Sequence, residues 1–424
     1  MSEIMERAEA MLAGRAPGTL GHPAALWGGL AEVTDRTAFV AAFSNSAVLE
    51  TDAGLVVVDT SSTEMSGRVH ESIRAWSTAS AHTIVFTHGH VDHVFGVERY
   101  EDDNQRAGAA APVVIGHEAI AARFDRYVET AGYNEIINGR QFQIPGYTWP
   151  RAWRYPDVTY HDHLDLEVGG ERFELHHARG ETDDHTWVFV PGRRVLCAGD
   201  MFIWASPNCG NPQKVQRYPL DWARGLRAMA ACGAEVLLPG HGLPITGAER
   251  VHAALTESAE LLEHLYTEVL TMMNAGARLD EIIHTVRAPQ HLIEKPYLRP
   301  IYDEPEFIVH NVWRLLGGWY DGNPATLKPA PDATVALEVA ALAGGADVLA
   351  RRALELAEAG DLRLAGHLAE WAALAAPEDR VVHAARAEVF ERRRAAETST
   401  MARGVFGGAA RESREAAGEA PEQR

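Results

Sequence analysis

The stretch TIVFTHGHVDHVFG, residues 83–96, decides the fold of this 424-residue chain. An apolar run from Ile84 to Phe86 stops abruptly, and three histidines and one aspartate follow within the next few residues. Imidazole nitrogen and carboxylate oxygen are ligands that zinc and similar divalent ions accept. The spacing His-x-His-x-Asp-His therefore predicts a metal site on a loop that leaves a strand, made by His88, His90, Asp92 and His93.

Other histidines carry less information. The chain has 20 of them, so short combinations such as HDH at 161–163 arise by chance. His176 and His177 fall in a stretch with a strand pattern and are expected to be ordinary core or surface residues. The metal prediction therefore depends on residues 88–93, where four ligand types coincide at close spacing.

The pattern resembles that of the metallo-β-lactamase superfamily, a fold in which two β-sheets lie between helices. Members follow the His-rich loop with a ligand at a strand end, then a bridging aspartate, then a last histidine. Three segments here match that plan, and in each a hydrophobic run stops at glycine before a good ligand. They are FELHHARGETDDHTWVFV at 173–190, RRVLCAGDMF at 193–202 and EVLLPGHGLPI at 235–245.

The resemblance implies two Zn²⁺ ions, with other divalent metals as alternatives, and a complete set of ligands. Glu181 occupies a position where the superfamily usually has histidine, and His185 is the alternative ligand there. Asp200 is expected at the end of its strand. The implied first ion is held by His88, His90 and Glu181, the second by Asp92, His93 and His241, and Asp200 bridges them.

The glutamate points to one branch, the alkyl sulfatases, which carry glutamate at this position. The segments at 302–331, which contains GGWYDGNP, and at 359–393 resemble the dimerisation domain of that branch. The chain also departs from the branch: it reads GETDDHT at 180–186 instead of Thr-Glu-Ala-Pro-Ala-Glu-Met, and Asp200 replaces a bridging glutamate. We read GGWYDGNP as a structural turn.

The expected fold class is α/β, with an αββα metallo-β-lactamase sandwich followed by an all-α helical dimerisation domain. Short apolar runs and glycines fill the first 250 residues, whereas helical spacing begins with ERVHAALTESAELLEHLYTEVLTMMNAG at 249–276. The expected organisation is an N-terminal segment 1–24, a catalytic domain 25–248, a helical domain 249–412 and a disordered tail 413–424.

The formal charge of 39 − 59 = −20 excludes nucleic acid as an expected partner. Because the same charge repels an anionic substrate, the metals and nearby cations must supply local positive charge. Arg217 lies in a region that resembles a sulfate-facing part of the alkyl sulfatases, and Lys214 and Tyr218 are its expected companions in substrate binding.

No signal-length apolar core opens the chain, and no run approaches the ~20 apolar residues of a membrane span. The three cysteines show no paired spacing, so we expect no disulfide framework. These features predict a cytoplasmic protein without a membrane partner, and the helical half predicts a homodimer.

The expected function is hydrolysis of a small-molecule ester, foremost an alkyl sulfate, by metal-activated water. Asp92 and Asp200 are expected to orient the water, and His185 is either a proton-transfer group or a hydrogen-bonding scaffold. Attack on sulfur and attack on carbon remain open. The alternatives are a hydrolase of phosphoesters, lactones or thioesters and, in another class, a non-catalytic assembly protein stabilised by metal.

Overall fold

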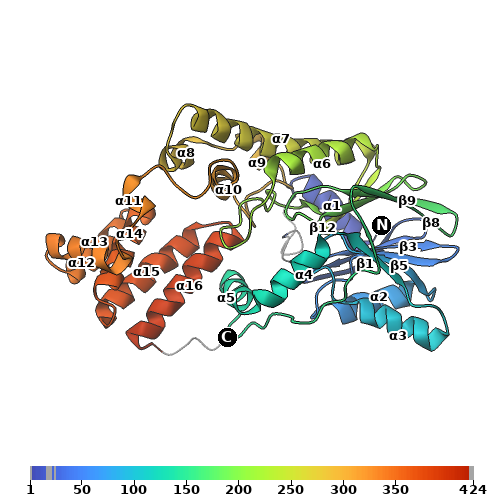
Figure 1. The fold of residues 1–424 in the computed structure, drawn as a ribbon, viewed down its shortest axis with the longest axis horizontal. Helices are drawn as coiled ribbons and strands as arrows, with labels where there is room; N and C mark the ends of the chain where they lie inside the picture. The colour runs from blue at the N-terminus through green and yellow to red at the C-terminus, as the bar shows by residue number, and fades with distance from the viewer. Residues whose placement is uncertain (1, 16–21, 23–24, 420–424) are drawn as a thin grey trace. The chain divides into compact units, whose positions relative to one another are not determined.

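A computed structural model describes residues 2–15, 22 and 25–419 (Figure 1). The chain divides into two compact units, the first made of residues 1–131 and 150–319 and the second of residues 132–149 and 320–424. The first unit contains both β-sheets, and the second is helical. Within the described residues no single helix is both long and apolar enough to cross a bilayer, although the helix pair 332–343 and 346–358, bent by 85°, meets that test jointly.

The first sheet has seven strands in chain order among the described residues. Its strands from β4 onward pair in parallel, and β4 to β6 are largely buried on both faces. In β4, for example, Val56 and Val58 join the core between the sheets, whereas Leu55 and Val57 face the outer helices. This explains the uninterrupted apolar runs. The strands are β1 (Trp27–Thr34), β2 (Thr37–Ala42), β3 (Ser46–Thr51), β4 (Gly54–Val58), β5 (Ala81–Val85), β6 (Val113–His117) and β7 (Val158–Tyr160).

The second sheet has the order β13-β12-β11-β10-β9-β8. Its β11 and β12 are parallel, and the other pairs are antiparallel. All nine residues of β11 are buried, because the strand lies inside the sheet and is covered on both faces. The strands are β8 (His163–Val168), β9 (Glu171–His177), β10 (Thr186–Val190), β11 (Val195–Ile203), β12 (Val236–His241) and β13 (Ile245–Thr246).

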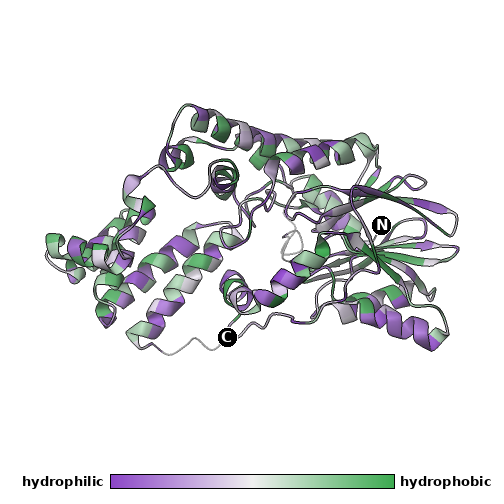
Figure 2. Cartoon of the chain, viewed as in Figure 1, coloured by the Kyte–Doolittle hydropathy of each residue, from purple (hydrophilic) through white to green (hydrophobic). Residues whose placement is uncertain are grey.

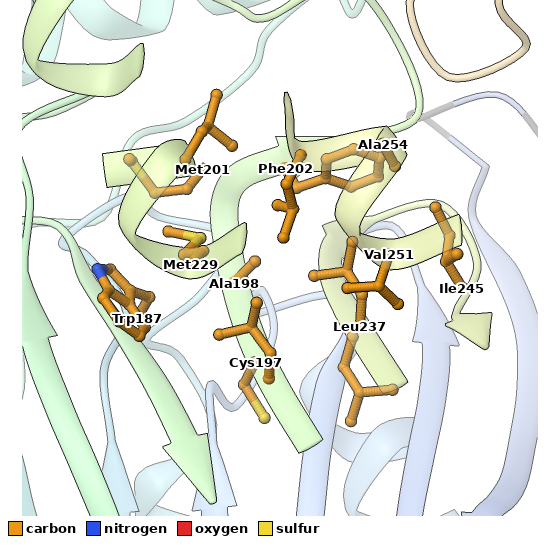
Figure 3. Close-up of a cluster of buried hydrophobic side chains, with 14 of the residues drawn as sticks. Trp187, Cys197, Ala198, Met201, Phe202, Met229, Leu237, Ile245, Val251 and Ala254 are labelled. Carbon is orange, nitrogen blue, oxygen red and sulfur yellow. The ribbon is translucent and has the colours of Figure 1, made fainter. Parts of the chain in front are cut away.

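Helices cover the outer face of each sheet. Helices α2 (Ser66–Trp76), α3 (Val97–Ala107) and α4 (Ile120–Glu129) contribute buried residues to the core on the outer face of the first sheet. On the second sheet, Met229 of α6 (Pro219–Ala231) and Val251 of α7 (Ala248–Asn274) pack over β11 and β12 (Figure 3). The expected αββα sandwich and the helix at 249–276 are therefore confirmed, and α1 (Glu3–Leu12) packs beside β1.

One strand differs from expectation at a position that matters. We expected β11 to end at Gly199-Asp200, but it continues to Ile203, with irregular register around Gly199. Gly199 has φ +50°, and a Cβ there would lie 2.7 Å from Thr87 and 2.8 Å from the ring of His185. The glycine permits a kink within a continuing strand, and this kink turns Asp200 toward the loop after β5.

The first unit ends with short helices that follow α7. They are α8 (Leu279–Thr285), α9 (Gln290–Ile293) and α10 (Pro305–Gly317). The GGWYDGNP segment connects α10 to α11 (Pro324–Leu327) without helical structure, as expected for a turn. Its Trp319 is 71% exposed within the chain.

The second unit contains α11, α12 (Asp332–Ala343), α13 (Ala346–Glu358), α14 (Leu362–Ala375), α15 (Arg380–Ala396) and α16 (Thr400–Ala417). Hydrophobic and hydrophilic residues alternate along α15 and α16, as in amphipathic helices packed on one side (Figure 2). The segment 132–149, with most of α5 (Ala131–Gln141), also belongs to this unit. Gln143 donates a hydrogen bond of 2.8 Å to the backbone oxygen of Gly404.

The tail is ordered further than expected. Helix α16 continues to Ala417 and ends at Gly418 in a left-handed cap, so the first residues of the segment 413–424 are helical. Ser413 is buried and accepts a hydrogen bond of 2.6 Å from Arg386, which explains the extension. Residues 420–424 lie outside the described residues.

Candidate metal centre

The predicted metal loop leaves the C-terminal end of β5 and folds back on itself. His88 Nε2 lies 2.8 Å from His90 Nδ1. His93 Nε2 lies 3.7 Å from a carboxylate oxygen of Asp92. His88 and His93 are fully buried, whereas the side chains of His90 and Asp92 are each 17% exposed. The four predicted ligands therefore converge, and solvent reaches them on the side of His90 and Asp92.

Asp200 lies between this loop and His241, the last residue of β12. One of its oxygens is 3.4 Å from His93 Nε2. The other is 3.8 Å from His88 Nε2 and 3.3 Å from His241 Nε2. His241 Nε2 is also 3.3 Å from Asp92. The two oxygens of Asp200 thus face different imidazoles, which is the arrangement that a bridging carboxylate requires.

Glu181 reaches the same place from the loop between β9 and β10. Its Oε1 is 3.7 Å from His90 Nδ1 and 2.8 Å from Arg217 Nη1. The same oxygen accepts a hydrogen bond of 2.6 Å from the side chain of Asn208. Burial raises the pKa of Glu181 to about 7, although the charge of Arg217 acts in the opposite direction. The carboxylate is therefore isolated from solvent and faces the histidines.

These side chains form three groups, and within each group the ligand atoms lie within 4.8 Å of one another. Glu181 belongs to one of them, whereas His185 belongs to none of the groups found among the described residues. The groups are His88, His93 and Asp200; Asp92, His93 and His241; and His90, Glu181 and Asp200.

The donor set fits a divalent cation. Glu181 Oε2 is buried without a hydrogen-bond partner, and the buried Oδ1 of Asp200 makes no hydrogen bond of good geometry, although His93 Nε2 lies 3.4 Å away. Buried carboxylate oxygens without good hydrogen bonds are costly, and a cation would satisfy both of them. Nitrogen and oxygen donors in this number are the ones that zinc binds. The residues present are thus able to hold metal at this edge of the two sheets.

Protonation of the imidazoles agrees with that fit. Burial, together with the neighbouring histidines, lowers the pKa of His88 well below its usual range, so its ring is neutral and able to bind metal. Burial acts on His93 in the same direction, but the carboxylates of Asp200, Asp59 and Asp92 outweigh it and raise the pKa of His93 well above its usual range. Without metal, this cluster of carboxylates attracts a proton, and a metal cation would take the proton's place.

Asp59 is a functional residue that the sequence analysis missed. It follows β4 with φ 60° and accepts hydrogen bonds from the backbone and the hydroxyl of Thr87, each of 2.7 Å. Its Oδ2 lies 2.7 Å from His93 Nδ1, which leaves Nε2 to face Asp200 and Asp92. A carboxylate that fixes a metal-binding imidazole in this way is a recurring feature of metal sites. The signal was an aspartate at the end of the apolar run GLVVVD.

A second carboxylate fixes the backbone of the metal loop. Asp184 accepts a hydrogen bond of 2.8 Å from the backbone N–H of Gly89, between His88 and His90. Its other oxygen accepts a hydrogen bond of 2.8 Å from the buried side chain of Arg123 in α4. A Cβ at Gly89 would lie 2.8 Å from the side chain of Arg123, so glycine is required for this approach. Asp184 therefore acts on the loop backbone.

His185 lies beneath the centre. Its ring stacks on His88 at 4.8 Å, and its Nε2 accepts a hydrogen bond of 3.1 Å from the backbone of Asp200. Burial lowers the pKa of His185 to about 3. Of the two roles considered from the sequence, these contacts favour the hydrogen-bonding scaffold.

The three predicted substrate-binding residues have different surroundings. Arg217 is 3% exposed and paired with Glu181. Burial and the nearby charge of Arg217 lower the pKa of Lys214 to about 7, although Asp92 and Glu181 act in the opposite direction. Tyr218 is half-buried, and the guanidinium of Arg179 lies 4.7 Å from its ring centre. Of these three residues, Lys214 is the one whose pKa both Asp92 and Glu181 act to raise.

Tyr302, just before α10, was also missed. Burial first, and then the charges of Glu181, Asp92 and Asp200, raise its pKa well above the usual range. Its phenol thus lies within electrostatic reach of the metal centre and stays protonated. The sequence offered the YDEPEF segment but nothing that placed it beside the histidines.

Comparison with known proteins agrees with this geometry. A family model described as the metallo-beta-lactamase superfamily matches residues 40–241, and one described as alkyl sulfatase dimerisation matches residues 278–416. The first match begins in β2 and ends at His241, the last of the converging ligands.

Individual relatives are more distant. A linear primary-alkylsulfatase of Pseudomonas sp. is 26% identical over 374 residues, which cover 81% of this chain and 69% of the relative. An (R)-specific secondary-alkylsulfatase of Pseudomonas sp. is 25% identical over 374 residues, 82% of this chain and 56% of the relative. The chain spans little more than half the length of the second protein.

Among solved structures, the stereoselective inverting sec-alkylsulfatase Pisa1 from Pseudomonas sp. superposes with a TM-score of 0.83 at 22% identity, covering 93% of this chain and 66% of that chain. At this identity the likeness concerns the fold. The family models thus identify a metallo-β-lactamase superfamily segment at residues 40–241, followed by an alkyl sulfatase dimerisation segment at residues 278–416.

Proposed function

We propose that this protein is a dinuclear metallohydrolase that cleaves sulfate esters of small organic alcohols. The observation that carries the proposal is the convergence of seven ligands into three groups, with Asp200 shared by two of them. The names of the relatives supply the substrate class, since those compared above are alkylsulfatases. Two Zn²⁺ ions in this centre would supply a Lewis acid for the ester oxygens and lower the pKa of water to about 7.

The side chains of the centre would bind the two ions and orient the water. In the division that the resemblance implies, His88, His90 and Glu181 would hold one ion and Asp92, His93 and His241 the other. Asp200 is close to residues of both sets, since it groups with His90 and Glu181 and also with His88 and His93. Asp92, whose side chain is 17% exposed, and Asp200 would accept a hydrogen bond from the attacking water and so orient it.

Positive and hydrogen-bonding groups beside the centre would bind the sulfate. Lys214 lies within electrostatic reach of Asp92 and Glu181, and the protonated phenol of Tyr302 can donate a hydrogen bond to an anionic oxygen. Because the whole chain carries a charge of −20, these local groups must offset a repulsive field. We therefore expect turnover of an anionic substrate to rise with ionic strength at low salt.

The deciding experiment pairs metal analysis with a substrate panel. The purified protein is expected to contain about two zinc ions per chain and to release sulfate from alkyl sulfates. Turnover restricted to phosphate esters, lactones or thioesters would contradict the sulfatase proposal while preserving the hydrolase. Absence of bound metal and of any turnover would contradict both and favour the non-catalytic assembly protein.

Isotope labelling identifies the bond that breaks. The relative Pisa1 is described as inverting, and inversion requires attack on carbon. We infer the same C–O cleavage here, so that reaction in ¹⁸O-water places the label in the alcohol. Label in the released sulfate would instead show attack on sulfur.

We further propose that the chain forms a homodimer through its helical segment. The supporting observation is the match of residues 278–416 to a dimerisation family. Light scattering after gel filtration is expected to give twice the chain mass of 46.3 kDa. A monomer at all concentrations would overturn this part of the proposal and leave the metal chemistry untouched.

A further inference from the structure

Arg217 lies beside the metal centre but is not an open anion-binding group. Its side chain is 3% exposed, and its Nη1 lies 2.8 Å from Glu181 Oε1. The same nitrogen donates to the backbone oxygen of Asn208. At least one terminal nitrogen of the guanidinium is thus already bonded to oxygen atoms of the protein.

The contacts of Glu181 are asymmetric. Its Oε1 accepts from both Arg217 and the side-chain nitrogen of Asn208, the latter at 2.6 Å. Its Oε2 is buried and has no hydrogen-bond partner. Two donors on one oxygen fix the rotation of the carboxylate, so the other oxygen is left for a cation.

Arg217 is itself fixed from the outer side by α10. The side-chain nitrogen of Asn311 donates a hydrogen bond of 3.0 Å to the backbone oxygen of Arg217, and its side-chain oxygen accepts one of 3.4 Å from the backbone N–H. Asn311 is 5% exposed. Both ends of the arginine are therefore held, its backbone by Asn311 and its guanidinium by Glu181.

We propose that Arg217 is a positioning residue that orients and neutralises Glu181 as a metal ligand, instead of binding the substrate sulfate. The inference rests on the proposed metal function. A buried carboxylate needs a counter-charge, whereas a neutral imidazole at the same position would need none. The role of Arg217 is therefore tied to the chemical identity of residue 181.

A double-mutant cycle tests this dependence. Zinc affinity of the apo protein is measured by competition with a chelator for the unsubstituted protein, R217M, E181H and E181H/R217M. In the Glu181 background, R217M is expected to lower zinc affinity about 10–100-fold, the usual effect of removing an outer partner of a ligand. In the E181H background, the same change is expected to lower it less than about 3-fold, because no buried carboxylate remains to be neutralised.

Two further variants serve as controls. R217K keeps the charge and is expected to lose less affinity than R217M. R224M removes an arginine on α6 whose side chain is 71% exposed, and is expected to bind zinc as the unsubstituted protein does. Circular dichroism of each apo variant verifies that the fold is retained.

Two outcomes would overturn the proposal. If R217M keeps its zinc affinity but raises KM for an alkyl sulfate, Arg217 binds substrate. If R217M loses the same affinity in both backgrounds, it supports the fold generally and has no specific relation to Glu181. Absence of zinc binding by the unsubstituted protein would instead contradict the metal function itself, so the two failures are distinguishable.

Discussion

Two groups of histidines can be compared among the described residues of the first unit, and their ring nitrogens are arranged differently. In the metal centre, ring nitrogens and carboxylate oxygens form groups whose ligand atoms lie within 4.8 Å of one another. In the second group, on β6, β8 and β9, the rings pack face to face. His117 stacks on His177 at 3.7 Å, and His176 stacks on Trp187 at 4.1 Å. No metal-binding triad was found there among the described residues.

The difference lies in the partners of the rings. Asp59 holds one nitrogen of His93 so that the other faces the centre. The Nδ1 atoms of His117 and His177 are instead bonded to backbone groups of Ala119 and His185. Stacking uses the ring face, whereas metal binding uses the ring edge. Local abundance of histidine therefore matters less than the contacts that set ring direction.

The largest expected effect comes from removing the shared carboxylate. Asp200→Ala is expected to lower sulfate release more than about 100-fold, above the range for outer partners of a ligand, and to reduce bound zinc. Elemental analysis and initial rates measure both. His163→Ala, on β8 in the second group, is the control and should retain both properties. Equal metal loss in the two variants would contradict the inference that only the first group of histidines binds metal.

Metal removal is expected to destabilise the first unit. A ligand present at 100 times its Kd stabilises the folded state by about 2.7 kcal/mol, so chelation should lower the free energy of unfolding by a similar amount. Urea titration with and without chelator measures this, and added zinc should restore the original curve. Identical curves would contradict a centre formed by the folded chain.

The contribution of ring direction can be isolated. Asp59→Ala removes the partner of His93 Nδ1 and is expected to weaken zinc binding about 10–100-fold without removing any ligand. Asp162→Ala is the control, since Asp162 is an exposed partner of His161, which precedes β8 and lies outside the metal centre. Unchanged zinc affinity in the Asp59 variant would show that ring direction is set by other contacts.

The stacked group should respond to pH. Burial lowers the pKa of both His117 and His177, and for His117 the charge of its neighbour adds to that effect. Because the unfolded chain takes up protons near pH 6.5 and the native pair does not, the apo protein should lose stability as pH falls below about 6.5. His117→Asn is expected to flatten this dependence in urea titrations between pH 7.5 and 5.5. An unchanged slope would show that other groups dominate.

Much of the fold follows from local signals. Apolar runs that stop at glycine located β9, β10 and β12, and helical spacing located α7. The same runs located the ligands, because strand ends are visible in one-dimensional sequence. The position of Asp200 was less predictable, since a kink inside β11 moves a side chain without ending the strand.

What escaped prediction depends on contacts between distant segments. Asp59 reaches His93 because β4 and β5 pair in parallel, which no local pattern announces. Tyr302 reaches the centre from a connection after α9. Arg217 was recognised as important, but its nearest anion proved to be Glu181. The domain boundaries expected at 248/249 remain a prediction, since the family models leave 242–277 unassigned.

The helical unit is discontinuous in the chain, since residues 132–149 join residues 320–424. Gln143 and its partner Gly404 on α16 are separated by 261 residues of sequence. The long intervening loop must close before this contact forms, which raises contact order and slows assembly. A fragment starting at residue 320 would lack part of its own core, so the helical unit matures only after the metal-binding unit has been made.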